Sequence, residues 1–236
     1  MAKFVPVVIA EPADETSRRS FVSTLDAVTK PGLYHEAIVV VPGSLLADAR
    51  LALGARAGHA TFVTVPDGSG HAIMAAAGCV LADKDCPEAP ILLMDASLDR
   101  SAFPDFHREV VRCAHALDEG FIVSFTAGDG DDAEPTGDYA FSFATARQEY
   151  LAHAPGIMAY AESSIARAAS DMNVVRLDDA PVFFDPGSFG EVVASVSEAA
   201  RSLRHRVGAL REAYSPWTRQ HGSYDGFYAS RNAPTP

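Results

Sequence analysis

The sequence predicts an α/β protein with a mostly parallel sheet, helices on both faces and a small antiparallel extension. Five apolar runs rich in β-branched residues have the length of buried parallel strands, at 5–10, 37–42, 61–65, 90–95 and 121–126. Helical patterns separate several of them, at 44–57, 70–82 and 103–118. This alternation with short links is typical of βαβ crossovers, and 236 residues with 48% hydrophobic side chains can bury one large core.

Each of these elements has a local justification. The first run, VPVVIA, is too short for a signal sequence or a membrane span, which favours a buried strand. The helical segment 44–57 begins at Ser44, a suitable N-cap, and the alanine-rich segment 70–82 follows a glycine-rich turn. In 103–118, apolar side chains recur at spacings of three and four, which places on one helix face Phe106, Val110, Cys113 and Leu117.

The alternation ends near residue 127. An acidic loop at 127–138 begins with calcium-loop spacing, but Ala133 and Glu134 stand where a ligand and a glycine are needed, which favours a solvated loop. The following segments predict an edge or antiparallel strand, a short helix, one or two strands and a long amphipathic helix, at 139–143, 145–153, 174–185 and 188–213. We expect one domain over 1–213 and an aromatic tail over 214–236. The tail is expected to be an extended arm that contacts a partner, a truncated linker, or a segment that packs back on its own sheet.

The charge, the cysteine content and the absence of certain motifs argue against several classes of function. The net charge of −12 argues against non-specific binding to nucleic acid or to anionic membranes, although it does not exclude one electropositive pocket for a nucleotide. The three cysteines lack CxxC or Cys/His ligand spacing, which fits ordinary thiols in a reduced, cytoplasmic protein. The sequence also lacks a GxSxG nucleophile elbow and a His pair at helical spacing, so nothing specific supports a hydrolase or a zinc site.

Ligands of such sheets bind beyond the carboxyl ends of the strands, so the residues that come after each strand are the candidates. Asp95 ends the fourth strand and Asp99 follows it, and two carboxylates there can hold Mg²⁺. The alternative is a solvated turn in which Asp99 caps the next segment. The turn with Gly68, Ser69 and His71 has neither P-loop nor GxGxxG spacing. It therefore predicts either a ligand contact or a tight turn with His71 as a capping or surface residue.

Segment 11–20 comes after the first strand and contains no glycine that would let backbone N–H groups approach a phosphate. Its three acidic residues would repel a triphosphate. Arg18 and Arg19 are its cations, and they are the candidate catalytic groups if phosphates are bound here.

Taken in order over roughly residues 4–195, the segments resemble the mannose-1-phosphate guanylyltransferase family of sugar-nucleotide pyrophosphorylases. The segments that carry the resemblance are VTVPDGSGHAIMAAAGCVL, PILLMDASLD, PTGDYAFSF, ATARQEYLAHAPGIMAYAESSI and FFDPGSFGEVV. The resemblance implies a Rossmann-like, nucleotide-diphospho-sugar transferase-like fold, with a strand near Gly156. It implies Mg²⁺ on Asp185 together with Asp95 or Asp99. It implies nucleotide-sugar contacts from Gly68, Ser69, His71, Thr136, Gly137, Tyr139 and Gly156.

This sequence differs from the family at the residues that carry out the family's reaction. The glycine-rich loop with its Arg and the later Lys are missing, and Ser97 stands at the position of the first metal-binding Asp in an ungapped comparison. One preorganised donor is typically worth about 2.7–4 kcal/mol to such a reaction, so losing several predicts lost catalysis. The first hypothesis is an impaired guanylyltransferase-like pseudoenzyme that binds a nucleotide sugar or acts through a partner enzyme. The alternatives are an active Mg²⁺-dependent sugar-1-phosphate nucleotidyltransferase with a rebuilt site and a non-enzymatic, homo-oligomerising scaffold.

Overall fold

The computed structural model describes residues 3–29, 32–102, 106–127, 134–171, 173–177, 188–194 and 227–231. Its strands are β1 (Val5–Ile9), β2 (Ala37–Pro42), β3 (Ala60–Val65), β4 (Ile91–Asp95), β5 (Phe121–Ala127), β6 (Glu134–Phe141), β7 (Ser170–Asp171), β8 (Val174–Arg176) and β9 (Phe227–Arg231). Its α-helices are α1 (Glu15–Ala27), α2 (Leu46–Leu53), α3 (His71–Asp85), α4 (Phe106–Asp118), α5 (Phe143–His153), α6 (Pro155–Arg167) and α7 (Phe189–Ala194). Three 3₁₀ turns join them, η1 (Gly43–Leu45), η2 (Gly54–His59) and η3 (Arg100–Ala102).

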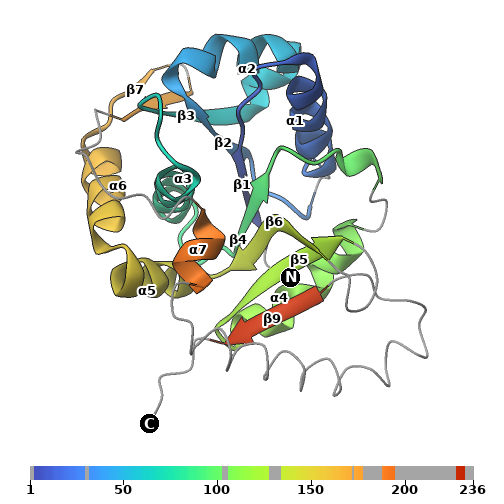
Figure 1. The fold of residues 1–236 in the computed structure, drawn as a ribbon, viewed down its shortest axis with the longest axis vertical. Coiled ribbons are helices and arrows are strands. Elements are labelled where there is room, and N and C mark those ends of the chain that lie inside the picture. The colour runs from blue at the N-terminus through green and yellow to red at the C-terminus, as the bar shows by residue number, and fades with distance from the viewer. Residues whose placement is uncertain are drawn as a thin grey trace.

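The strands form one sheet in the order β7-β8-β3-β2-β1-β4-β6-β5-β9 (Figure 1). The centre is parallel, because β1 pairs with β2 and β4, and β3 pairs with β2 and β8. β6 enters between β4 and β5 and runs antiparallel to both. This arrangement confirms the predicted parallel sheet with an antiparallel extension.

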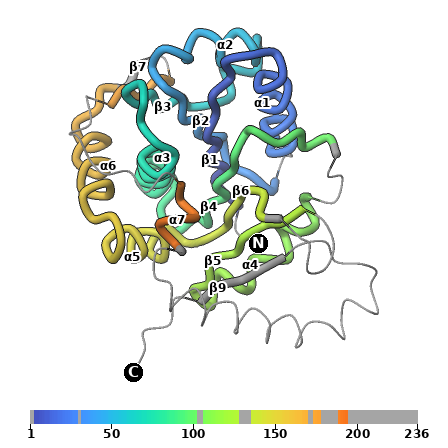
Figure 2. Tube along the Cα trace, in the orientation of Figure 1, coloured from blue at the N-terminus to red at the C-terminus, as the bar shows by residue number. Residues whose placement is uncertain are grey.

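Helices cover both faces of this sheet, and each face has its own apolar cluster. On one face, α3 packs on the central strands together with α5, α6 and α7. On the other face lie α1, α2 and α4. The tube trace follows the same arrangement, with α3 beside α6 and α1 beside α2 (Figure 2). The predicted placement of helices on both faces is therefore confirmed.

α3 lies so close to the sheet because it carries small side chains. Its buried stretch runs from Ala72 to Ala82. A Cβ on Gly78 would collide with the Val7 side chain and come within 2.9 Å of Val40, so glycine sets the distance between helix and strands. The alanine run that predicted a helix thus also explains how that helix packs.

The predicted strands and helices of the first half are confirmed within a few residues, with two corrections. The helix expected over 44–57 is α2 alone, flanked by η1 and η2, because Gly54 adopts a positive φ of 56° and ends it. α1 begins at Glu15, inside segment 11–20, to which the sequence patterns assign no helix. Its capping box, Asp14 with Ser17, is the local signal that was overlooked.

The second half holds one clear error. The strand implied near Gly156 by the family resemblance is wrong: residues Pro155–Arg167 form helix α6. Pro155 occupies the first turn, where proline suits a helix, and the side chains of Ile157, Ala161 and Ser164 bury one face at helical spacing. The strand predicted at 139–143 is β6, which begins earlier, at Glu134, and ends at Phe141. Phe143 already belongs to α5.

The predicted long helix at 188–213 falls mostly outside the described residues, which show α7 at its start. The tail contributes β9, which pairs antiparallel with β5. At least this part of the tail joins the protein's own sheet, as one of the alternatives for the tail predicted (Figure 1).

Candidate functional site at the carboxyl edge of the sheet

Several candidate residues come after strands that end at the same edge of the sheet. Because β6 runs opposite to β4, the beginning of β6 lies beside the end of β4. This brings Gly137 next to Asp95, and Thr136 precedes Gly137 on β6. The turn after β3 and the segment after β1 reach this edge too.

Asp95 is held by two buried side chains. Its backbone N–H donates to Asp138 Oδ1 at 3.1 Å, and its carbonyl accepts from Arg100 Nη2 at 2.8 Å. Arg100 and Asp138 also bind each other, with Nη1–Oδ2 at 2.6 Å and Nη2–Oδ1 at 2.7 Å. Their side chains are 2% and 1% exposed, so the ion pair is buried.

Asp138 has competing influences on its protonation. Burial raises the pKa of Asp138 to about 6, while Arg100, the Thr136 hydroxyl and the Asp95 N–H act to lower it. A carboxyl group with this pKa is ionised at neutral pH and remains paired with Arg100. The pair therefore presents one negative and one positive charge beside Asp95.

Only one oxygen of the Asp95 carboxylate accepts a hydrogen bond from the described residues. Its Oδ1 accepts from the Ser97 N–H at 2.8 Å, and no described residue donates a hydrogen bond to its Oδ2. Gly137, with φ of 79°, lies so close that a Cβ there would be 3.2 Å from the Asp95 Cβ. One carboxylate oxygen can therefore accept a ligand or coordinate a cation.

Asp99 has a different environment from Asp95. Its Oδ1 accepts from the Ser23 hydroxyl of α1 at 2.7 Å and from the Ser101 N–H at 3.0 Å. These hydrogen bonds, with that from Ser23 the largest, lower the pKa of Asp99. Such a carboxylate tethers α1 to the start of η3, as expected if Asp99 caps the turn.

The turn after β3 is a backbone turn stabilised from a neighbouring segment. Ser69 N–H donates to the Pro66 carbonyl at 3.1 Å, and Gly68 supplies the positive φ of 80° that the turn requires. The carboxylate of Asp67 accepts from Ser44 N–H at 3.0 Å. The Ser69 hydroxyl is buried and has no partner among the described residues.

His71 begins α3, and its Nε2 lies 3.7 Å from the Glu11 carboxylate. Both side chains are about half exposed. The contact joins the segments after β1 and β3, so the structure brings His71 and Glu11 together at the carboxyl edge. Gly70 caps α3 without a side-chain hydrogen bond.

The segment after β1 does not form an open loop around an anion. It leads directly to Asp14, whose carboxylate accepts from the Ser17 N–H at 2.8 Å and so occupies the N-terminus of α1. Arg18 pairs with Asp48 of α2 at 2.5 Å and donates from Nε to the Pro12 carbonyl at 3.2 Å. Arg19 is exposed, and its nearest ion-pair partner is Glu15 at 4.0 Å.

The remaining predicted contacts lie on β6 and α6. The Thr136 hydroxyl lies 3.0 Å from Asp138 Oδ2. The Tyr139 ring packs edge-on against Phe189, and burial raises the pKa of its hydroxyl. Gly156 lies in the first turn of α6, and nothing in the described contacts joins it to Asp95.

No metal-ligand set is complete in the described residues. Among them, no three His, Cys, Asp or Glu side chains come together in a way that could hold a metal ion. Asp185 lies outside the described residues, so its predicted role with Asp95 or Asp99 stays a prediction. No described residue donates to the Oδ2 of Asp95 or of Asp99, so either carboxylate could supply an oxygen ligand to Mg²⁺; the Oδ1 of Asp95 accepts one hydrogen bond and that of Asp99 accepts two.

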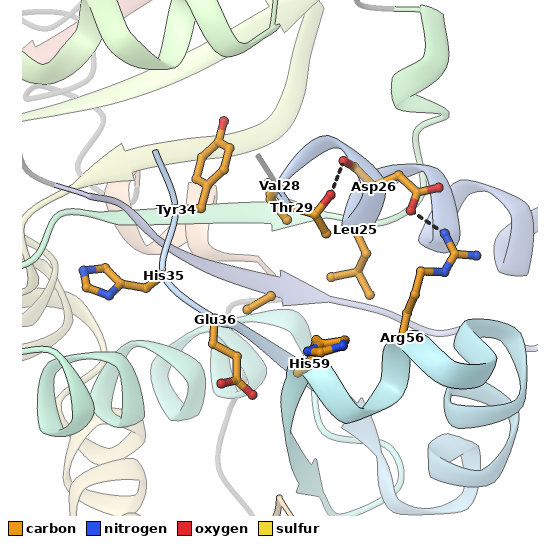
Figure 3. A pocket seen from close by; sticks show the side chains of 11 residues that line it. Leu25, Asp26, Val28, Thr29, Tyr34, His35, Glu36, Arg56 and His59 are labelled. Atoms are coloured by element: carbon orange, nitrogen blue, oxygen red, sulfur yellow. Dashed lines mark hydrogen bonds and ion pairs between the residues drawn. The ribbon is translucent and has the colours of Figure 1, made fainter. Parts of the chain in front are cut away.

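A cavity of about 380 Å³ lies at the opposite edge, where β2 and β3 begin (Figure 3). The end of α1, the segment before β2 and η2 surround it, and its rim includes His35, Glu36 and His59. Arg56 and Asp26 form an ion pair across one side. None of the predicted site residues lines this cavity.

Sequence reasoning missed Arg100 and Asp138. Their separation of 38 residues hides the pairing. Asp138 lies within PTGDYAFSF, but the resemblance assigns no role to it or to Arg100. The signal available was a charged residue beside an otherwise apolar strand, as in GDYAF, where Asp138 interrupts β6. A charge at such a position needs a partner.

The fold of this chain is similar to that of several solved protein structures. A mannose-6-phosphate isomerase from Helicobacter pylori matches with a TM-score of 0.53 and 12% identity, over 74% of this chain and 86% of that chain. A mannose-1-phosphate geranyltransferase from Thermus thermophilus matches with a TM-score of 0.50 and 12% identity, over 75% and 74%. Protein-family models and curated proteins give no match. At such identity the similarity establishes the fold, which is the predicted nucleotide-diphospho-sugar transferase-like α/β fold.

None of the helices in the described ranges combines the length and the apolar character that a membrane span requires.

Proposed function

We propose that this chain binds a nucleotide or nucleotide sugar at the carboxyl edge of its sheet and is impaired as a nucleotidyltransferase. Asp95 is the polar centre of the site, and Gly68, Ser69, His71, Thr136, Gly137 and Tyr139 are the candidate contacts around it. The protein acts through this binding or through a partner in sugar-nucleotide metabolism. Mg²⁺ enters only with the ligand, held by Asp95 and by Asp185.

The observation that carries the impairment is the connection from β1 to α1. A nucleotidyl transfer needs fixed cations and N–H groups around the phosphates. Here Asp14 fills the N-terminus of α1 with its own carboxylate, and Arg18 is engaged by Asp48. Glu11 adds a further negative charge at the same edge. This supports a site that holds a ligand without strong stabilisation of a transferring phosphoryl group.

Binding is tested by thermal unfolding and calorimetry with GDP-mannose, UDP-glucose, GTP and Mg²⁺. A ligand at 100 times its Kd stabilises the fold by about 2.7 kcal/mol, so a binder shifts its unfolding temperature with ligand concentration. Asp95→Asn should weaken the binding. His59→Ala, at the opposite edge, is the matched control and should leave it unchanged. If no compound shifts the transition, the scaffold alternative replaces this proposal.

A second candidate function is an active Mg²⁺-dependent nucleotidyltransferase, which is favoured by the Asp95 Oδ2, since none of the described residues donates a hydrogen bond to it. In this case Arg18 and Arg19 would act on the phosphates, Arg18 after leaving its pair with Asp48. Incubation of NTP and sugar 1-phosphate pairs with Mg²⁺ would then release pyrophosphate, and Asp185→Ala would abolish the release. Absence of turnover with every pair would exclude this candidate and leave the binding role.

A further inference from the structure

We infer that the buried Arg100–Asp138 ion pair is a positioning device that fixes Asp95 for the ligand or cation it holds. The inference rests on the proposed function, because that function makes Asp95 the centre of the site. It adds two residues that neither motif nor resemblance assigns.

The pair holds both peptide groups that flank the Asp95 side chain. Asp138 accepts from the N–H that precedes it, at 3.1 Å, and Arg100 donates to the carbonyl on its other side, at 2.8 Å. A planar guanidinium can bind a carboxylate with two parallel hydrogen bonds and still reach a carbonyl, which an ammonium group cannot match. Rotation of either peptide group would therefore break a charge-assisted hydrogen bond.

The sheet alone does not provide this restraint on the β6 side. The pairing of β4 with β6 extends from Ile91↔Phe141 to Leu93↔Tyr139 and stops there. Beyond it, Gly137 departs from extended backbone with φ of 79°. The Asp138 side chain then takes the place of a backbone acceptor, so Asp95 remains fixed where the regular ladder has ended.

The burial of the pair argues for a positioning role over a purely stabilising one. Removing two charges from water is costly, and apolar side chains of similar volume often stabilise a core as well or better. What apolar residues cannot do is donate to the Asp95 carbonyl and accept from its N–H. The Phe106 ring also packs near the guanidinium, and Arg100 Cζ lies 5.9 Å from the ring centroid. This contact restricts the orientation of the guanidinium plane.

The test uses a double variant, Arg100→Met with Asp138→Leu, which leaves no unpaired buried charge. Amide hydrogen exchange is measured at Asp95 and at Ala96. The Ala96 N–H donates to the Ile9 carbonyl of β1 at 3.0 Å, so it reports on the opposite side of the same strand end. A matched control, Arg147→Met with Glu162→Leu, removes an exposed pair that joins α5 to α6.

The expected result is that exchange at Asp95 accelerates by about tenfold or more in the double variant, while exchange at Ala96 does not change. Equal acceleration at both amides would mean only a general loss of stability. That outcome overturns the inference, as does unchanged exchange at Asp95.

A second measurement links the pair to the proposed function. Mn²⁺, a probe for Mg²⁺, is titrated in the presence of saturating GDP-mannose and followed by water-proton relaxation, with Asp95→Asn to identify the site. If Asp95 binds the ion, the double variant should lower the affinity by roughly 10- to 100-fold, as loss of groups behind a metal ligand does, and the control should not. An unchanged affinity overturns the inference.

The two measurements distinguish failure of the positioning role from failure of the proposed cation site. If the native protein binds no Mn²⁺ in the presence of GDP-mannose, or if Asp95→Asn leaves that binding unchanged, the cation assignment in the proposed function fails. The positioning of Asp95 is then decided by the exchange comparison, which needs no ligand.

Discussion

The hydroxyl of Tyr150, on α5, donates a hydrogen bond of 2.6 Å to the carbonyl of Ala72, in the first turn of α3. The ring of Tyr150 is fully buried against Phe189 of α7. One side chain thus joins three helices on the same face of the sheet. Because Ala72 is the neighbour of His71, the contact also fixes the start of α3 at the candidate site.

Tyr150→Phe should lower the free energy of unfolding by about 0.5–1.5 kcal/mol, because it removes one neutral hydrogen bond and keeps the ring. Tyr150→Ala should cost about 3–5 kcal/mol, since it also leaves a cavity. Urea unfolding monitored by circular dichroism measures both. Equal losses would show that the hydroxyl, and not the ring, dominates.

Gly78→Ala should destabilise the protein by about 1–3 kcal/mol, because the new methyl group would press on Val7 and Val40. This loss exceeds the roughly 1 kcal/mol that alanine gains over glycine in a helix. Gly58→Ala is the control, since a Cβ there meets open space. A Gly78→Ala variant as stable as the native protein would contradict the close packing of α3.

Gly137→Ala should reduce both stability and ligand binding. It combines a positive φ with a Cβ 3.2 Å from that of Asp95, so the carboxylate must move. Gly120→Ala has the same φ of 79° with no neighbour within 4 Å, and it isolates the backbone cost of about 1–2 kcal/mol. Calorimetry should show weaker binding for the first variant alone. Equal binding by both would separate Gly137 from the site.

Stability should depend on acid pH through Asp14. The hydrogen bond from the Ser17 N–H is the main cause that lowers the pKa of Asp14 below its ordinary value of 3.8. The folded state thus binds the proton less readily than the unfolded state, so the stabilisation is present above about pH 4 and is lost as pH falls through the folded pKa.

Comparing Asp14→Ala with the native protein by urea unfolding at several pH values should show a difference that disappears in acid. Asp14→Asn also caps a helix and does not titrate, so its difference from Asp14→Ala should stay constant with pH. A pH-independent difference between the native protein and Asp14→Ala would contradict the assignment.

Arg18→Met should lower stability by only about 0.2–1 kcal/mol, because the Arg18–Asp48 pair is about one-third exposed. A double-mutant cycle with Asp48→Ala should assign most of this loss to the pair. Nucleotide affinity, measured by calorimetry, should not change if Arg18 has no role at the phosphates. A large loss of affinity would favour the active-enzyme alternative.

Sequence patterns determined much of the architecture. The β-branched runs fixed β1 to β5, and the spacing of Phe106, Val110, Cys113 and Leu117 fixed the buried face of α4, because periodicity directly reports which side chains face the core. The glycine-free segment after β1 also predicted that a phosphate loop would be missing. The capping box that starts α1 was equally local and was overlooked.

The tertiary structure decided the contacts that hold the site. Arg100 meets Asp138, Arg18 meets Asp48, and Tyr150 meets Ala72 across 38, 30 and 78 residues. No local pattern encodes such pairings, because they depend on β6 entering between β4 and β5, on the packing of α1 against α2 and on the packing of α5 against α3. Local periodicity specifies which side chains are buried, whereas the path of the chain in three dimensions specifies which buried polar groups come into contact.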